Sequence, residues 1–237
     1  MHKRPLSTPP APMPRQSVLA YPSRPSPKLV YKADMTDDFN PVPPHARPAD
    51  PTGRVPAGQV VTTRFPVLTA GTPRITPKED WTFTVDGLVD TPLTFDWAAF
   101  NDLPMQEFTV DIHCVTRWSK LDTVWRGVSL DTLFEAAGVQ PKARYLQAHA
   151  DGDYSANLKF EDLTGGQAFV ALDFDGKPLT EEHGGPARLV VPKLYFWKSA
   201  KWLRKLTLAE WDVKGFWERL GYHNYGDPWL EQRYSLD

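Results

Sequence analysis

The stretch "DIHCVTRWSKLDTVWRGVSLDTLFEAAGV", residues 111–139, carries a strand signal, a lone cysteine and a helix signal in succession. Apolar and polar side chains alternate through 106–114, and Cys114 falls on the apolar side at or just past the end of the predicted strand. Ser129 is a suitable helix N-cap, apolar residues follow it at helical spacing, and Gly138 is a typical stop. The stretch therefore predicts a strand, an inward-pointing thiol and a short helix.

Short strands are also predicted on both sides of this stretch. The segment "WTFTVDGLV" alternates apolar and polar residues before an Asp-Gly turn, and "FDGKP" is a turn sequence between two further apolar runs. The predicted strands outside the opening stretch lie at 81–89, 144–150, 168–174 and 187–192. We therefore expect a mixed α+β fold in which strands dominate.

The first part of the chain differs in composition from the rest. Residues 1–60 hold fourteen of the 24 prolines, which disfavours regular helix and central strand there. We predict that residues 1–58 form an extended or disordered arm. Residues 59–237 are then expected to form one domain.

Composition and charge exclude several classes of protein. A single cysteine allows no intrachain disulfide, and it also rules out an iron–sulfur cluster or attached c-type haem within this chain. The net charge of −2, with eight basic against four acidic residues in 1–60, is too even to suggest nucleic-acid binding. No window is apolar enough for a membrane span and no export signal is evident. We therefore expect a cytoplasmic protein.

Three interpretations of Cys114 are open from residue type alone. A free cysteine is most often a small buried hydrophobe. It can also be a thiolate nucleophile beside a histidine, for which His113, His149 and His183 are candidates. The third interpretation is a soft ligand for a metal.

A second cluster of polar residues lies in "EEHGGPARLVVPKLYFWKSAKWLRKLTL", residues 181–208. The run 184–186, Gly-Gly-Pro, makes a constrained turn whose backbone can approach a ligand closely, and Arg188 follows it. Lysines and Ser199 then alternate with aromatic residues. This pattern suits a flat anionic ligand that carries phosphate, although a strand edge with solvated lysines would look similar.

Taken together, residues 111–139, "DGDYSANL" at 151–158 and "HGGPARLVVPKLYFWKSAKWL" at 183–203 resemble the molybdenum-cofactor domain of the sulfite oxidase family. The resemblance runs from about residue 60 to the C-terminus. It is greatest to small single-domain bacterial members, which are related to the catalytic subunit of the periplasmic methionine sulfoxide reductase. It implies that family's strand-dominated fold and a molybdenum–molybdopterin cofactor.

The resemblance also assigns roles to individual residues. Cys114 matches the cysteine whose thiolate binds molybdenum, and Tyr154 matches the tyrosine that faces the substrate, with Arg117 expected beside it. Trp125 matches an aromatic residue near that pocket. The positions implied to hold the pterin and its phosphate are Arg64, His149, His183, Arg188, Ser199, Ala200 and Lys201.

Some family features are absent from this sequence. Sulfite oxidases have two arginines after the ligand cysteine, whereas residues 115–119 read Val-Thr-Arg-Trp-Ser, with Arg117 alone. The family's "N-H-x-P-V" segment is replaced by Phe-Pro-Val after Arg64. The haem and C-terminal dimerisation domains of animal sulfite oxidases are also missing, and the sequence gives no function for "GYHNYGDPWLEQRY". The pocket for sulfite is therefore not reproduced.

We accordingly expect an oxidoreductase that performs two-electron oxo transfer on a small oxyanion or on an S- or N-oxide. Since no flavin or nicotinamide fingerprint is present, its electrons should be exchanged with a separate redox protein. The main alternative is a non-catalytic protein that keeps the fold to bind an anionic ligand or a partner. A Cys-His hydrolase is the third hypothesis.

Overall fold

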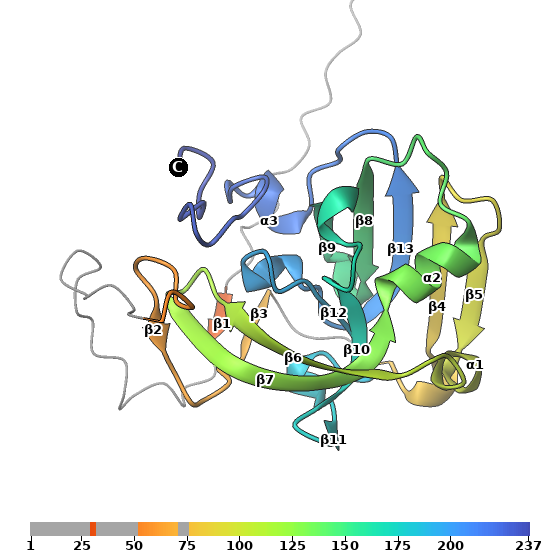
Figure 1. Ribbon diagram of the computed structural model, residues 1–237, viewed down its shortest axis with the longest axis horizontal. Helices are drawn as coiled ribbons and strands as arrows, with labels where there is room; N and C mark the ends of the chain where they lie inside the picture. Colours follow the sequence, from red (N-terminus) through yellow and green to blue (C-terminus); the bar gives the residue numbers. More distant parts are fainter. Residues whose placement is uncertain (1–28, 32–51, 71–75) are drawn as a thin grey trace, which may run out of the picture.

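The protein, described from a computed structural model, is built around two β-sheets (Figure 1). The structure describes residues 29–31, 52–70 and 76–237. One sheet has five strands in the order β5 (Leu93–Asp96), β4 (Thr82–Gly87), β13 (Leu203–Ala209), β8 (Tyr145–Ala150) and β9 (Ser155–Lys159). Its neighbouring strands are antiparallel, except that β13 and β4 are parallel.

The second sheet contains the sequence motif with the cysteine. Its central path is β11 (Lys177–Pro178), β10 (Phe169–Phe174), β7 (Trp118–Ser129) and β2 (Val60–Val61). In addition, β6 (Gln106–His113) pairs with β7, and β12 (Arg188–Val190) pairs with β10. The long β6–β7 hairpin curves beneath the body in Figure 1, and Cys114 lies in its turn.

The remaining elements are short. The α-helices are α1 (Trp97–Asn101), α2 (Leu130–Ala137) and α3 (Phe216–Arg219). The 3-10 turns are η2 (Lys78–Asp80), η3 (Asp151–Asp153), η4 (Phe160–Asp162), η5 (Glu181–His183) and η6 (Phe196–Lys198). No helix among the described residues is both long and apolar enough to cross a membrane.

The predicted elements of the body are confirmed. The Ser129 side chain accepts the Asp131 N–H at the start of α2, and Gly138 ends that helix with φ 64°. Strands β4, β6, β8, β10 and β12 lie at the five predicted places, and a turn at 175–176 joins β10 to β11. The structure therefore has the predicted mixed α+β fold in which strands dominate.

Part of the predicted N-terminal arm contacts the body. Residues Leu29–Tyr31 form β1, which pairs antiparallel with β3 (Leu68–Ala70). Residues 1–28 and 32–51 of the predicted arm lie outside the described residues. The arm therefore contributes one strand next to the segment that leads into the pocket described below.

Strand β10 is buried on both faces of the second sheet, which explains its continuous apolar run. Val170 and Leu172 face the larger hydrophobic cluster, which α2 and the five-stranded sheet complete. Phe169 and Ala171 face a smaller cluster that contains Cys114. The thiol thus lies at the edge of a packed apolar layer, as the alternation in β6 predicts.

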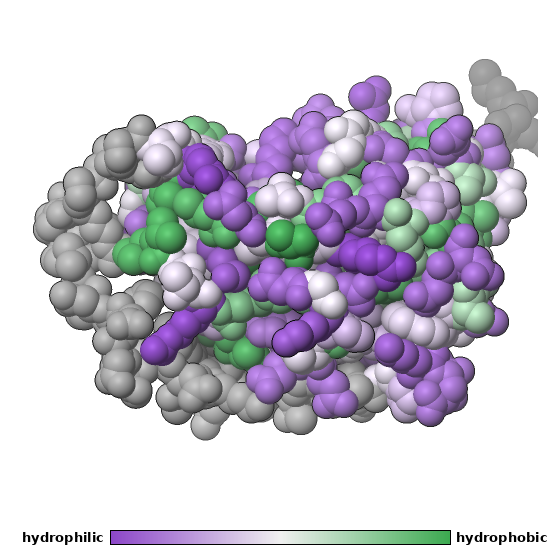
Figure 2. Space-filling model, turned by 60° about the horizontal axis from the view of Figure 1, so that its bottom comes forward, coloured by the Kyte–Doolittle hydropathy of each residue, from purple (hydrophilic) through white to green (hydrophobic). Residues whose placement is uncertain are grey.

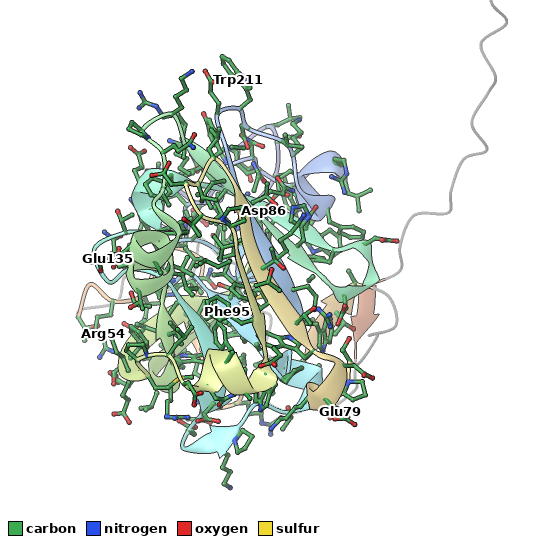
Figure 3. All side chains as sticks on the ribbon, turned by 90° about the vertical axis from the view of Figure 1, so that its right-hand side faces the viewer. Arg54, Glu79, Asp86, Phe95, Glu135 and Trp211 are labelled. Atoms are coloured by element: carbon green, nitrogen blue, oxygen red, sulfur yellow. The ribbon has the colours of Figure 1, made fainter. Side chains whose placement is uncertain are left out.

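The outer surface in Figure 2 is mixed: hydrophobic residues lie in small groups among hydrophilic ones. Trp211 is the most exposed aromatic side chain among the described residues. It is 73% exposed and projects from the loop after β13, at the end of the five-stranded sheet (Figure 3).

Candidate active site

A pocket lies where the β6–β7 turn, the 183–202 segment and the C-terminal segment meet. Its space outside the protein atoms is about 990 Å³, which includes open solvent at its mouth. The pocket is lined by residues of these three regions and by residues 65–70. Four of the sequence-predicted positions with reactive or charged side chains line it: Cys114, His183, Arg188 and Lys201.

Cys114 is held at the pocket by the hairpin turn. Its N–H donates to the carbonyl of Trp118, 2.8 Å away, and its carbonyl accepts the N–H of Arg117. The Sγ atom lies 3.1 Å from the Thr116 hydroxyl. Burial raises the pKa of the thiol, and Thr116 and the more distant cations Lys201 and Arg233 partly oppose this. The free thiol therefore stays protonated until a cation or metal displaces the proton.

Nothing in the described structure pairs Cys114 with a histidine base. His113 is buried, and its Nδ1 lies 2.8 Å from the Ser119 hydroxyl. Burial lowers the pKa of His113 to about 4, with Asp111 opposing. This ring is therefore a neutral part of the core. The hydrolase hypothesis therefore loses His113 as its base.

Arg188 is a fully buried cation at the floor of the pocket. Its Nη1 and Nη2 donate to the carbonyls of His183 and Ser199 at 2.8 and 2.9 Å, and the guanidinium stacks over Phe196, 4.2 Å from the ring centre. Burial lowers its pKa to about 9. Carbonyl dipoles and a ring face satisfy its donors without neutralising its charge.

Lys201 adds a second positive charge to the same pocket. Its Nζ donates to the carbonyls of Leu68 and Glu182, at 2.9 and 2.6 Å. Burial, followed by repulsion from Arg188, lowers its pKa to about 7. Gly184 makes room for this lysine, because a Cβ there would lie 2.8 Å from the Lys201 Cβ. The backbone at Gly184 thus packs directly against the base of the Lys201 side chain.

His183 presents an unsatisfied polar atom at the pocket. Its ring stacks on Phe65 with centroids 3.9 Å apart, and its Nδ1 is buried without a hydrogen-bond partner. Burial, with Arg188 and Lys201 adding to it, lowers the pKa of His183 to about 3. The ring is therefore neutral and can donate to or accept from a ligand, because a buried polar atom without a partner is costly.

Tyr154 also lines the pocket, directly before β9. Its hydroxyl donates to the carbonyl of Trp197 at 2.5 Å. Burial raises the pKa of Tyr154 well above its usual value, and Glu218 adds to the rise. The hydroxyl therefore stays protonated; its single O–H is given to the Trp197 carbonyl, and its oxygen can still accept a hydrogen bond.

Three predicted residues support the pocket from within the fold. The Ser199 hydroxyl accepts the Val191 N–H at 2.9 Å, and Ala200 belongs to the larger core cluster. Trp125 is fully buried beneath the pocket, where its ring lies 5.9 Å from that of Phe65. Only Ser199 of these three lines the pocket.

The structure does not bring three other predicted residues into the pocket lining. His149 points to the opposite face of β8, where Lys205 of β13 is its Cα partner. Arg64 is exposed, whereas its neighbour Phe65 lines the pocket. Arg117 occupies the left-handed position of the hairpin turn, with φ 74°, and its guanidinium lies 4.0 Å from the Glu231 carboxylate. That geometry turns it away from the pocket.

Comparisons with known proteins agree on one family. The sequence profile of the oxidoreductase molybdopterin binding domain matches residues 69–217. The chain belongs to this family. Its sequence is 46% identical over 192 residues to a Bacillus subtilis protein named uncharacterized oxidoreductase YuiH, covering 81% of this chain and 97% of the relative.

More distant relatives are longer than this chain. MsrP of Pseudomonas syringae pv. tomato, a protein-methionine-sulfoxide reductase catalytic subunit, is 26% identical over 166 residues, 62% of this chain and 49% of the relative. The crystal structure of the sulfane dehydrogenase SoxCD from Paracoccus pantotrophus aligns with TM-score 0.55 and 25% identity, over 61% of this chain and 41% of that chain. The resemblance to the sulfite oxidase family is confirmed.

The residues of the pocket fit the molybdenum–molybdopterin cofactor of this enzyme family. Within the described part of the chain, no carboxylate forms an ion pair with Arg188 or Lys201, so the pocket needs an anionic ligand to balance two cations. The free Nδ1 of His183 offers a further polar contact. The Cys114 thiol supplies a soft donor, which loses its proton on coordination. This protein is therefore a molybdopterin-dependent oxidoreductase.

Sequence reasoning missed the contribution of the C-terminal segment. Trp217 and Tyr222 line the pocket, and Arg233 donates to the carbonyl of Val115, beside Cys114. The density of aromatic residues in "FWERLGYHNYGDPW" is the one signal that could have indicated a buried role for this segment.

Proposed function

We propose that this enzyme transfers an oxygen atom to or from a small oxyanion or an S- or N-oxide, with two electrons exchanged with a separate redox protein. The bound cofactor supplies the two-electron oxo-transfer chemistry. The observation that carries the proposal is a single pocket lined by a thiol, two cations and a tyrosine: Cys114, Arg188, Lys201 and Tyr154.

Some residues of the pocket bind the cofactor, and others position the substrate. Arg188 and Lys201 bind the anionic part of the cofactor, and the neutral His183 ring adds a polar contact. Tyr154 keeps its proton and donates it to the Trp197 carbonyl, so it orients η6 beside the space for the substrate. The surrounding aromatic side chains exclude water from this space.

Cys114→Ser is the variant that tests this proposal. Purified wild-type protein from a cofactor-competent host should contain about one molybdenum and one pterin per chain, by elemental and fluorescence analysis. The Ser variant should retain pterin through Arg188 and Lys201 but lose turnover with an artificial electron carrier. Ser119→Ala is not a suitable control, because Ser119 is bonded to His113; Ser235→Ala, at an exposed site, is the matched control.

Two results would contradict the proposal. One is stoichiometric zinc in place of molybdenum. The other is full turnover by Cys114→Ser, because an activity that does not need the thiol would not be molybdenum chemistry at this pocket.

A further inference from the structure

The C-terminal segment, residues 215–237, is an integral part of the pocket and not a loose tail. Most of it lies beyond the region matched by the family profile, which ends at 217. It returns over the β6–β7 turn, where Arg233 donates to the Val115 carbonyl at 3.1 Å and the Trp229 ring lies 5.9 Å from that of His113. Figure 1 shows this segment beside α3, over the end of the hairpin that carries Cys114.

A buried polar network fixes the segment in place. The Lys198 ammonium lies 2.7 Å from the Glu218 carboxylate, and both side chains are almost fully buried. Glu218 also accepts the indole N–H of Trp197 at 2.8 Å, and Lys198 donates to the carbonyl of Asn224 at 2.7 Å. The segment is therefore tied at two points to η6, which itself lines the pocket.

Two rings of the segment form an aromatic wall with a ring of η6. Tyr222 lies 4.8 Å from Trp217 and 5.2 Å from Trp197, between ring centroids, and all three residues line the pocket. Gly226 allows this packing, because a Cβ there would lie 2.7 Å from the Trp197 ring. The wall adjoins Tyr154, whose hydroxyl is anchored on the Trp197 carbonyl.

The cations that line the pocket come from outside the C-terminal segment. The cationic side chains that line the pocket are Arg188 and Lys201, which the cofactor's anionic group would occupy. Arg117 points to Glu231, and Arg233 stacks on Tyr195. Asp151, a carboxylate, also lines the pocket. An inorganic oxyanion needs paired positive charge when it leaves water, and the wall does not provide it.

We propose that the C-terminal segment selects the substrate: Trp217, Tyr222 and Trp197 bind the apolar substituent of a neutral organic S- or N-oxide, and inorganic oxyanions such as sulfite are poor substrates. This inference rests on the proposed function. A sulfoxide or amine oxide pairs one polar bond with apolar groups, which matches a pocket that combines polar groups with an aromatic wall.

In the reductive direction the reaction balances with an external donor. The sulfur–oxygen or nitrogen–oxygen bond breaks, two electrons arrive from a one-electron dye such as reduced benzyl viologen, and two protons come from solvent. The products are the sulfide or amine and one water.

The test compares substrates that differ in their apolar group. Holoenzyme with reduced benzyl viologen should have a kcat/KM for methyl phenyl sulfoxide about fivefold above that for dimethyl sulfoxide, because an added ring contact is worth about 1 kcal/mol. Sulfite, with ferricyanide as acceptor, should be slower than either. Trp217→Leu and Tyr222→Leu should remove most of this preference by raising KM for the aryl substrate alone.

Matched variants separate a binding role from damage to the fold. Trp217→Phe keeps a ring in the wall and should retain the preference. Trp211→Ala removes a tryptophan that is 73% exposed and outside the pocket, and it should change nothing. If a leucine variant does not fold, calorimetric binding of methyl phenyl sulfide to the wild-type holoenzyme and to Trp217→Phe gives the same comparison without turnover.

The possible failures can be distinguished. Fast sulfite oxidation, or an aryl preference unchanged in both leucine variants, would overturn the inference while leaving the proposed function intact. Molybdenum-loaded enzyme that turns over none of these substrates would overturn both.

Discussion

Lys201 is a half-buried lysine whose pKa in the cofactor-free protein affects stability. In the folded chain without cofactor, burial and the neighbouring Arg188 lower its pKa to about 7, whereas an exposed lysine titrates near 10.4. The unfolded chain therefore binds more protons than the folded chain between these two values. It follows that this residue makes the cofactor-free protein more stable as pH rises from about 7 to 10.

Lys201→Met should remove that dependence. We expect the melting temperature of cofactor-free wild type, measured relative to that of the variant, to rise between pH 6.5 and 9.5. The same variant should hold less pterin when it is expressed in a competent host. Lys205→Met is the control, since Lys205 pairs with Asp86 on the outer face of β13. A wild-type curve parallel to that of Lys201→Met across this range would show that the ammonium is not destabilised.

Cys114 illustrates what a sequence pattern can predict for one residue. Alternation along β6 placed the thiol on the apolar side, and it packs in one cluster with Ile112. The pattern could not show that Arg117, three residues later, turns away. A left-handed turn residue decides the direction of that side chain, and nothing in the residue types of the turn indicated it.

At the scale of secondary-structure elements, the C-terminal segment depends on the buried pair of Lys198 in η6 and Glu218 in α3. Burial lowers the pKa of Lys198, and the Glu218 carboxylate is the main opposing influence. Two carbonyls and the Asn157 amide oxygen also accept from Lys198, but none of them carries a charge. The carboxylate is therefore the group that makes this buried ammonium tolerable.

Glu218→Gln should lower the free energy of unfolding by about 3 kcal/mol, because it leaves the buried Lys198 charge uncompensated. Urea denaturation measures the change. Glu161→Gln, in an exposed pair with Lys159 at 3.8 Å, should cost less than about 1 kcal/mol. Equal effects of the two substitutions would mean that the buried pair does not anchor α3.

The elements that sequence reasoning missed share a physical cause. Strand β7 (Trp118–Ser129) mixes polar and apolar residues because it pairs with strands on both sides. In β9, Asn157 is buried yet polar, because its amide donates to Asp212 and its oxygens accept from Lys198. Long-range partners satisfy these side chains, and a local pattern of hydrophobicity does not contain that information.

On the scale of the whole molecule, the predicted fold class and the predicted cofactor are confirmed. The shape of the pocket, by contrast, comes from segments that are distant in the sequence. Residues 65–70, the hairpin turn and the C-terminal segment meet at one place although they are far apart in the sequence. The sequence placed Cys114, Arg188 and Lys201 in one site through a resemblance. It offered nothing of the kind for Trp217 and Tyr222, because most of the C-terminal segment lies beyond the family's profile.

The last prediction concerns how electrons reach this chain. Each turnover moves two electrons, yet a single cysteine cannot hold an iron–sulfur cluster, and the sequence has no dinucleotide fingerprint. The purified holoenzyme should therefore turn over with a one-electron dye but not with NADH or NADPH alone. With these nucleotides, the absorbance at 340 nm should not fall when substrate is added. Residues 61–237 carry more acidic than basic side chains, so a partner with a basic docking face should also lose rate at high salt. Rapid oxidation of NADPH by the isolated chain, or a flavin or haem absorption band, would mean that it carries its own electron relay.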